Sequence, residues 1–272
     1  MLLAWLGQEH CCKPEKVGRK AAGLSRLMTE YPVPRGFCLT ASAHRAWKHW
    51  SNCGVGQARR DLLPPEMSEL LNSEYERLSN CDESTPGKPA VAVRSSGINE
   101  DGAKLSFAGQ YDTYLNVAEP SAVAEAIVRC WQSATADRVL AYGRANQIPV
   151  YNLDLAVLVQ RFIAADVSAV AFSRGPIGFD RLRDRVIVNA SWGLGDSTLG
   201  GKVNPDVFVV DKAGLTVEER KINDKRSMTV PFKKAGTRQV KVPRLFRCKP
   251  ALSDRQAIEI ARMAISLEQK SL

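Results

Sequence analysis

The stretch "VAVRSSGINEDGAKLSFAGQYDTYLNV" (residues 91–117) has strand-like patterns at both ends and small, polar and charged residues between them. Its apolar start predicts a buried strand, with Arg94 at the end where a side chain can reach into a cleft. A guanidinium engages phosphate oxygens with two parallel hydrogen bonds, and the small Ser95 and Ser96 let backbone amides approach an anion. A second small-residue loop contains Gly109. The stretch indicates a nucleotide phosphate site, and a structural turn with a surface arginine is the alternative.

A second cationic candidate lies near the N-terminus. The segment "KVGRKAAGLSRLM" (16–28) places Lys20 near the beginning of a helix predicted over 20–30. There the ammonium group and the positive end of the helix dipole would act together on an anion. A solvated surface lysine is the alternative. The Gly-rich turn at 192–201 lacks the spacing of a dinucleotide fingerprint, and the P-loop pattern is absent from the sequence.

Strand and helix patterns alternate along the chain, which predicts an α+β fold. Because the strands between 153 and 222 follow one another without an intervening helix, we expect them to form one antiparallel sheet. Helices are predicted to begin at Pro120 and behind Ser253, where Gln256 completes a capping box. We expect two lobes, 1–158 and 159–272. The strand predictions are 90–96, 153–163, 167–173, 185–191, 207–212 and 215–222.

Composition excludes several classes of protein. The chain has 272 residues and 25% charged residues, and no apolar run approaches the roughly 20 residues that span a bilayer. The N-terminal "MLLAWL" is too short for a signal-peptide core, so we expect a cytoplasmic protein without membrane association. The seven cysteines are scattered and only three histidines are present, which predicts free thiols and no metal site.

Positive charge is concentrated in residues 220–249, where eleven lysines and arginines accompany a single acid, Asp224. Such a segment can meet nucleic acid, a phosphorylated ligand or an acidic partner, or it can be a solvated face. Only Phe232 and Phe246 are available there for base stacking, so the segment is poorly suited to reading nucleic acid.

Six motifs together cover essentially the whole chain: "KVGRKAAGL", "YPVPRGFCLT", the 91–117 stretch, "VLVQRFIAADVSAVAFS", "ASWGLGDSTLGGKVNPDVFVVD" and "INDKRSMTV". They occur here in the order found in phosphoenolpyruvate synthase (pyruvate, water dikinase). The chain therefore resembles the N-terminal ATP-binding domain of that family, which includes pyruvate phosphate dikinase and rifamycin phosphotransferase. The resemblance implies a two-lobed ATP-grasp-type domain.

The resemblance implies a set of residues that bind ATP and take part in catalysis. Lys20 and Arg94 correspond to catalytic residues that hold the ATP phosphates, and Gly109 corresponds to the loop above them. Lys225 matches the lysine of a family "DK" motif and is expected near the cleft, whereas the acidic pair Glu100 and Asp101 has no assigned role. The implied ligands of ATP are Lys20, Arg94, Ser95, Gly109, Gln160, Arg161, Phe162, Ile163 and Lys225; residues 160–163 would form the hinge strand that receives adenine.

By the same resemblance, the enzyme transfers the β-phosphate of ATP to a histidine on a mobile domain. A barrel domain then passes this phosphoryl group to pyruvate, with release of AMP and phosphate. The sequence ends at Leu272, before the family's next motif, "DIEWA". We therefore expect a C-terminally incomplete domain whose main Mg²⁺ ligands and pyruvate site lie elsewhere, with the phosphohistidine and pyruvate domains absent or on a separate chain. Alone, the chain is expected to bind ATP weakly without phosphorylating pyruvate.

Several positions depart from the family pattern. Arg19 replaces a glycine, Arg35 replaces a proline and Asn189 replaces an acidic residue, and at position 196 the acidic residue is an aspartate, which is shorter than a glutamate. Two alternatives stay open. One is the ATP module of a rifamycin-type antibiotic phosphotransferase, which differs in its acceptor. The other is a non-catalytic interaction protein that uses residues 220–249.

Overall fold

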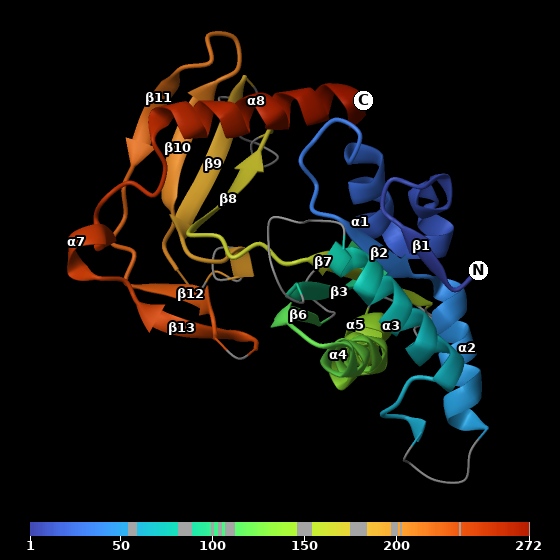
Figure 1. The fold of residues 1–272 in the computed structure, drawn as a ribbon. Helices are drawn as coiled ribbons and strands as arrows, with labels where there is room; N and C mark the ends of the chain where they lie inside the picture. Colours follow the sequence, from blue (N-terminus) through green and yellow to red (C-terminus); the bar gives the residue numbers. More distant parts are fainter. Residues whose placement is uncertain are drawn as a thin grey trace. The chain divides into compact units, whose positions relative to one another are not determined.

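A computed structural model shows a mixed helix and strand protein with antiparallel sheets, as the sequence predicted at the level of the α+β class (Figure 1). The described chain divides into two compact units, one of residues 1–163 with 234–236 and one of residues 164–233 with 237–272. The predicted boundary at 158 falls inside a strand, β7 (Leu155–Arg161), which belongs to the first unit. The described residues are 1–53, 59–80, 89–98, 101–102, 105–106, 112–145, 154–174, 184–196, 201, 203–233 and 235–271.

The first unit is built on a five-stranded antiparallel sheet with the strand order β1-β2-β7-β3-β6. Its central strand, β7, is the last of the five in the sequence and lies between β2 and β3, which precede it in the chain. The short pair β4 (Asp101–Gly102) and β5 (Leu105–Ser106) lies between β3 and β6 in the chain. The sheet strands are β1 (Leu3–Trp5), β2 (Gly36–Leu39), β3 (Val91–Gly97), β6 (Thr113–Val117) and β7.

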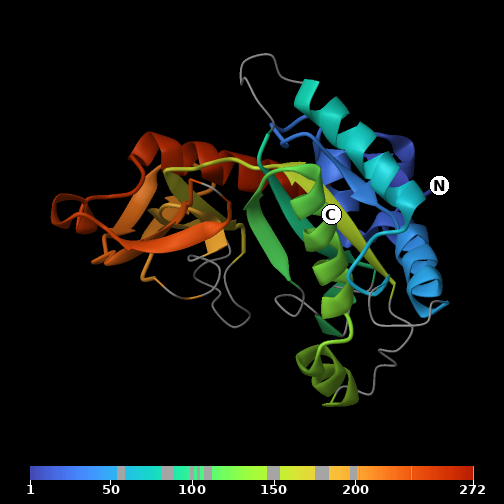
Figure 2. The ribbon, with the colours of Figure 1, turned by 60° about the horizontal axis from the view of Figure 1, so that its bottom comes forward.

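Helices cover both faces of this sheet. Alternate residues of β3 and β7, such as Val93 and Val157, pack into a large core with side chains from α2 (Ala41–Asn52), α3 (Pro65–Asn80) and α4 (Pro120–Ser133). Figure 2 shows α4, in green, lying against these strands. The other face packs Ala156 and Leu158 against α1 (Pro14–Leu27) and the 3₁₀ turn η1 (Glu9–Cys12). The helix α5 (Asp137–Ala145) follows α4. One sheet face therefore belongs to α1 and the other to α2, α3 and α4.

A buried histidine supports the beginning of β7 in the larger core. His44 of α2 is 2% exposed, and its Nδ1 accepts the Leu155 amide at 3.0 Å. Its ring stacks near those of Trp47 and Trp131, with centroids 5.9 and 5.6 Å away. Burial, reinforced by the neighbouring Lys48, lowers the pKa of His44 to about 3. The ring is therefore neutral at physiological pH, with its proton on Nε2 because Nδ1 acts as the acceptor.

This histidine makes stability fall in mild acid. The unfolded chain takes up a proton near pH 6.5 and the folded chain does so only near pH 3, so the unfolded state binds more protons between these values. The contribution is complete above pH 6.5 and is lost as the pH falls toward 3. On lowering the pH from 7.5 to 5.5, we expect His44 to cost about 1.4 kcal/mol of unfolding free energy. Urea denaturation at both pH values measures it.

A glutamine at position 44 keeps an acceptor for the Leu155 amide but does not titrate. His44→Gln should therefore lose less stability than the wild type over the same pH interval, even if its stability at pH 7.5 is lower. Equal losses in the two proteins would contradict the buried neutral histidine.

The second unit contains a four-stranded antiparallel sheet with the order β11-β10-β9-β8. Alternate residues of its strands, including Val188 and Phe208, face the helix α8 (Asp254–Ser271), which covers one side of the sheet (Figure 1). A two-stranded hairpin, β12 (Ser227–Pro231) with β13 (Thr237–Lys241), precedes the short helix α7 (Arg244–Arg247). The sheet strands are β8 (Val167–Phe172), β9 (Arg185–Trp192), β10 (Asp206–Asp211) and β11 (Val217–Lys221).

Local sequence signals predicted several elements well. The helix expected from Pro120 begins at that residue, and the box at Ser253 is confirmed because its amide donates to Gln256 Oε1 at 2.9 Å. The prediction of one antiparallel sheet over 153–222 was wrong for its first strand. That strand is β7, which pairs with β2 and β3 of the first unit instead of with β8. The spacing of strands along the chain does not reveal their pairing partners.

Part of the positive charge in 220–249 is neutralised within the second unit, where four of the eleven cations have acidic partners. Arg220 pairs with Asp254 at 3.0 Å, Lys225 with Asp206 at 2.6 Å, and Arg226 with Asp224 at 2.9 Å. Arg247 also pairs with Asp224, which holds the pKa of that carboxyl below its ordinary value. Two of these acids lie outside the basic segment, so counting charges within the segment overstates the positive charge available to a partner. Among the described residues, the structure shows no helix long and apolar enough to cross a membrane.

Candidate functional site

Helix α1 is broken at Gly18, just before the predicted lysine. Gly18 has φ +75° and ψ 164°, a left-handed backbone conformation that L side chains rarely adopt. A Cβ atom at this position would lie 2.2 Å from the Ser96 carbonyl oxygen, so the backbone of α1 approaches the end of β3 too closely for any side chain. The break starts a new helical segment, and Lys20 lies in its first turn.

Lys20 is hydrogen-bonded to the end of β3. Its Nζ donates a hydrogen bond of 2.7 Å to the carbonyl oxygen of Ser95. One residue farther along each element, the Ala21 amide donates to Ser96 Oγ at 3.1 Å. Ser96 thus satisfies an amide in the first turn of the helical segment, a role that a capping residue usually has within its own helix. These two bonds fix where the ammonium group stands relative to β3.

Arg94 lies on the same face of the sheet as α1. It is directly opposite Leu158 in the register of β3 with β7, and directly opposite residues of paired strands share a face. Leu158 packs against α1 residues, so the Arg94 side chain leaves the sheet on the α1 side. The half-buried Lys20 and Arg94, predicted from separate motifs, are therefore brought to one face of one sheet.

Ser95 points the other way. Its hydroxyl donates to the Asp112 carbonyl oxygen at 3.1 Å, and its amide donates to the same oxygen at 3.4 Å. Cys130 of α4 approaches that oxygen as well, with Sγ at 3.6 Å; burial raises the pKa of Cys130 to about 12, which keeps the thiol protonated. The Ser95 carbonyl group therefore accepts a hydrogen bond from Lys20 of α1. The Ser95 hydroxyl lies on the opposite face of the sheet, where it donates to Asp112.

The predicted hinge residues are at the end of β7. Gln160 is 6% exposed, and its side-chain amide donates to the Pro34 carbonyl oxygen at 2.9 Å. The Arg161 amide donates to the Arg35 oxygen at 2.8 Å, and the Phe162 amide donates to the Ala90 oxygen at 2.9 Å. Ile163 is the exposed member of the group, at 57%. The amides of residues 161 and 162 thus already donate hydrogen bonds to backbone carbonyl groups of neighbouring segments.

Lys225 belongs to the second unit and is fully enclosed there. It is 0% exposed, and its Nζ contacts Asp206 Oδ1 at 2.6 Å and the Asn223 carbonyl oxygen at 3.1 Å. Asp206 is also 0% exposed, and its carboxylate accepts the amides of Asn223 and Ala251 at 2.9 and 2.8 Å. In this conformation the Lys225 ammonium group is committed to a buried polar network.

Two predicted positions lie outside the described residues, Gly109 and Glu100. Asp101 contributes its backbone to β4. Sequence reasoning missed the positioning roles of Gly18 and Ser96. A glycine inside an otherwise helical pattern, in "KVGRKAAGL", was the available signal for the break; the partner of Ser96 is 75 residues away and leaves no local signal.

Comparisons with known proteins agree on the class of domain. Residues 57–271 match the family described as "Pyruvate phosphate dikinase, AMP/ATP-binding domain". The chain is 31% identical, over 97% of its length, to the prodigiosin synthesizing transferase PigC of Serratia marcescens. It is 28% identical over 98% of its length to a probable phosphoenolpyruvate synthase of Methanocaldococcus jannaschii, and 32% identical over 93% to a rifampicin phosphotransferase of Streptomyces sviceus. It spans 30%, 24% and 31% of these relatives, respectively.

Proposed function

Because the chain belongs to the pyruvate phosphate dikinase family of AMP/ATP-binding domains, we propose that it binds ATP and holds the phosphates with Lys20 and Arg94. The observation that carries this proposal is the convergence of the two cations on the α1 face of one sheet, where Ser95 fixes the Lys20 ammonium. A guanidinium and an ammonium group placed together would neutralise the negative charge of a polyphosphate.

The proposed fold is the ATP-grasp type that the family resemblance implies. Within the first unit, the break at Gly18 directs the beginning of a helical segment toward the end of β3, where its amides and Lys20 favour an anion together. We place adenine at the end of β7. Because the Arg161 and Phe162 amides are already bonded, we assign the edge of the base to the backbone of Ile163, the exposed residue of this hinge.

Mg²⁺ accompanies ATP in the proposed complex. The described residues contain no group of three or more histidine, cysteine, aspartate or glutamate side chains that could hold a metal ion. We assign no step to the metal.

For the whole reaction, we propose the ATP-using part of a phosphoenolpyruvate synthase-type enzyme, since such synthases recur among the relatives. In that reaction a phosphoryl group of ATP passes to a histidine on another domain and then to pyruvate. Lys20 and Arg94 would stabilise the charge that develops on the phosphoryl oxygens during the first transfer. The rifampicin phosphotransferase relative makes an antibiotic the alternative acceptor. The expected cytoplasmic location and the separate histidine-bearing chain stay predictions.

Removal of either cation should weaken ATP binding. A charge-assisted hydrogen bond contributes about 1.5–3 kcal/mol, so Arg94→Ala and Lys20→Ala should each raise the Kd for ATP about 10- to 100-fold. Isothermal titration of the purified chain with ATP and Mg²⁺ measures this change.

Lys16→Ala provides the matched control, because Lys16 lies on the same helix as Lys20 and is exposed. This variant should bind ATP like the wild type. If the wild type does not bind ATP, the proposed function fails. If Arg94→Ala binds as tightly as the wild type, the assignment of Arg94 fails while the function of the domain can stand.

A further inference from the structure

A cavity of about 410 Å³ opens between α2 and α4 in the first unit. Its size falls in the range of small-molecule sites, which is about 300–1,000 Å³. The residues on its floor, Trp47 and Trp131, belong to the core between the sheet and α2, α3 and α4, on the face opposite to α1. The cavity is therefore distinct from the Lys20 and Arg94 site. Its lining includes His44, Trp47, Lys48, Arg60, Trp131 and Gln132.

The floor of the cavity is aromatic and rigid. The ring centroids of Trp47 and Trp131 are 5.3 Å apart, and the His44 ring lies beside both. Each indole N–H is already bonded, that of Trp47 to the Leu62 carbonyl oxygen at 3.0 Å and that of Trp131 to the Leu155 oxygen at 2.9 Å. Their hydrogen bonds hold the rings in place without a ligand. Trp47 is 7% exposed and Trp131 only 1%, so Trp47 supplies most of the accessible aromatic surface of the floor.

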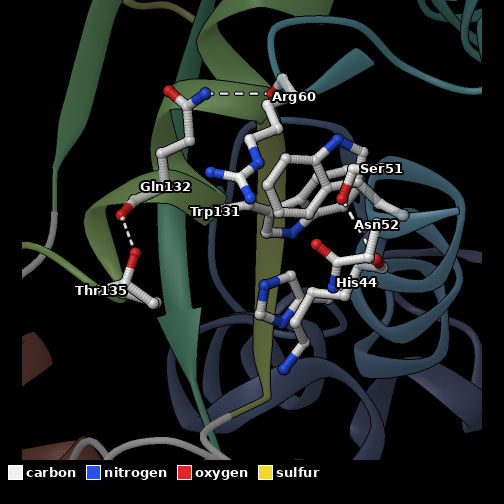
Figure 3. Close-up of a pocket in the computed structure, with 10 residues that line it drawn as sticks. His44, Ser51, Asn52, Arg60, Trp131, Gln132 and Thr135 are labelled. Atoms are coloured by element: carbon white, nitrogen blue, oxygen red, sulfur yellow. Dashed lines mark hydrogen bonds between the residues drawn. The ribbon is translucent and has the colours of Figure 1, made fainter. Parts of the chain in front are cut away.

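The buried His44 supplies a directed donor. Its Nδ1 is occupied by the Leu155 amide, so the neutral ring carries its hydrogen on Nε2. Nε2 has no hydrogen-bond partner among the described residues, although the side chain is almost completely buried and lines the cavity. Figure 3 shows His44 and Arg60 reaching the cavity from different elements. The Nε2–H group is therefore available to a ligand in the cavity that can accept a hydrogen bond.

Charge at the cavity is dominated by Arg60. Lys48 is shared with Asp154, at 3.6 Å, and Asp154 also pairs with Arg45. Within the described chain, Arg60 has no acidic partner for its guanidinium, and no carboxylate lines the cavity. The Arg60 backbone is held in position because Gln132 Nε2 donates to its carbonyl oxygen at 3.0 Å and to Asp61 Oδ1 at 3.0 Å. One guanidinium without an acidic partner matches a ligand with a single negative charge.

We propose that this cavity binds a small aromatic carboxylate, with its ring against Trp47 at the aromatic floor and its carboxylate between His44 Nε2 and the Arg60 guanidinium. The aromatic floor provides contact for a flat apolar body. The fork of the guanidinium fits a carboxylate, and a monoanion suits one unpaired cation better than a phosphate dianion does.

Isothermal titration of the full chain with 2-naphthoate tests the site. We expect saturable binding, and binding at least about tenfold weaker for the neutral analogue 2-naphthamide, which lacks the charge that Arg60 recognises. Acetate, which lacks the ring, should also bind at least about tenfold more weakly because it forfeits the contact with the floor. Failure of 2-naphthoate to bind, or equal binding by acetate or 2-naphthamide, overturns the proposal.

Arg60→Gln and Arg59→Gln are a matched pair of variants. Both residues are exposed and adjacent, but Arg59 stacks over the Trp50 ring, 5.2 Å from its centroid, and does not line the cavity. Arg60→Gln should weaken 2-naphthoate binding about tenfold or more, whereas Arg59→Gln should change it less than about twofold. Lys20→Ala should leave it unchanged, because Lys20 is on the other face of the sheet. Equal affinity of the Arg60→Gln variant and the wild type contradicts the site.

Discussion

Asp206→Ala should destabilise the second unit by about 3–5 kcal/mol, the usual cost of leaving a buried charge without its partner. The substitution would strand the Lys225 ammonium group, which is 0% exposed, together with the amides of Asn223 and Ala251. These bonds connect the start of β10 to the segment before β12 and to the segment before α8. Their loss should therefore affect the whole unit and not one loop. Urea denaturation followed by tryptophan fluorescence measures the change; Trp192 reports on residues 164–272, and the other four tryptophans report on the rest of the chain.

Two further variants separate the buried pair from ordinary surface charge. Asp206→Leu combined with Lys225→Met removes both charges, and it should be less destabilising than Asp206→Ala because no ammonium group remains buried alone. Asp224→Ala breaks the exposed pair with Arg226 and the partly buried pair with Arg247, and it should cost less stability than Asp206→Ala because no fully buried charge loses its partner. If Asp206→Ala denatures at the same urea concentration as the wild type, Lys225 is not held in a closed network.

Gly18→Ala is the second change with a large expected effect. The added methyl group would lie 2.2 Å from the Ser96 carbonyl oxygen, in a left-handed conformation that alanine adopts at a cost. We expect a loss of at least about 2 kcal/mol of unfolding free energy, since strain at a special backbone position and steric overlap add together. Because relief of the clash would move α1 away from β3, the bond from Lys20 to Ser95 should break and ATP binding should weaken.

Gly23 provides the control within the same helix. A Cβ atom there meets nothing within 4 Å, so Gly23→Ala should stabilise the protein by up to about 1 kcal/mol through the higher helix propensity of alanine. Urea denaturation and ATP titration of both variants make the comparison. The close approach of α1 to β3 would be refuted by a Gly18→Ala protein with wild-type stability and ATP affinity.

The sequence was informative wherever neighbouring residues determine the structure. The strand predicted over 90–96 is β3 (Val91–Gly97), the helix at Pro120 begins there, and the Ser253 box forms as expected. Lys20 and Arg94 could be chosen as anion-binding candidates because a helix beginning and a strand end are visible in the local pattern. The sequence could not predict that Lys20 and Arg94 lie on one face of the sheet, because this depends on the pairing of β3 with β7 and on the packing of α1.

Long-range partners account for what the sequence did not reveal. "INDKRSMTV" reads as a charged, exposed segment, yet Lys225 is buried because Asp206, 19 residues earlier in the chain, meets its ammonium group. Ser95 and Ser96 look equivalent, but strand alternation sends the first hydroxyl to Asp112 and the second to Ala21. The cavity at His44 is assembled from α2, Arg60 and α4, and no motif connects them.

The strand order of the first unit also affects how the protein is made. Because β7 lies between β2 and β3, these two strands cannot join one sheet until residue 161 has emerged from the ribosome. Until then, β2 and β3 each have an edge without its final partner, and such edges pair readily with other chains. Joining strands so distant in sequence is slow compared with forming local contacts. Nascent chains that stop before Leu155 should therefore depend on chaperones and aggregate in their absence, whereas chains that extend past β7 can close the sheet.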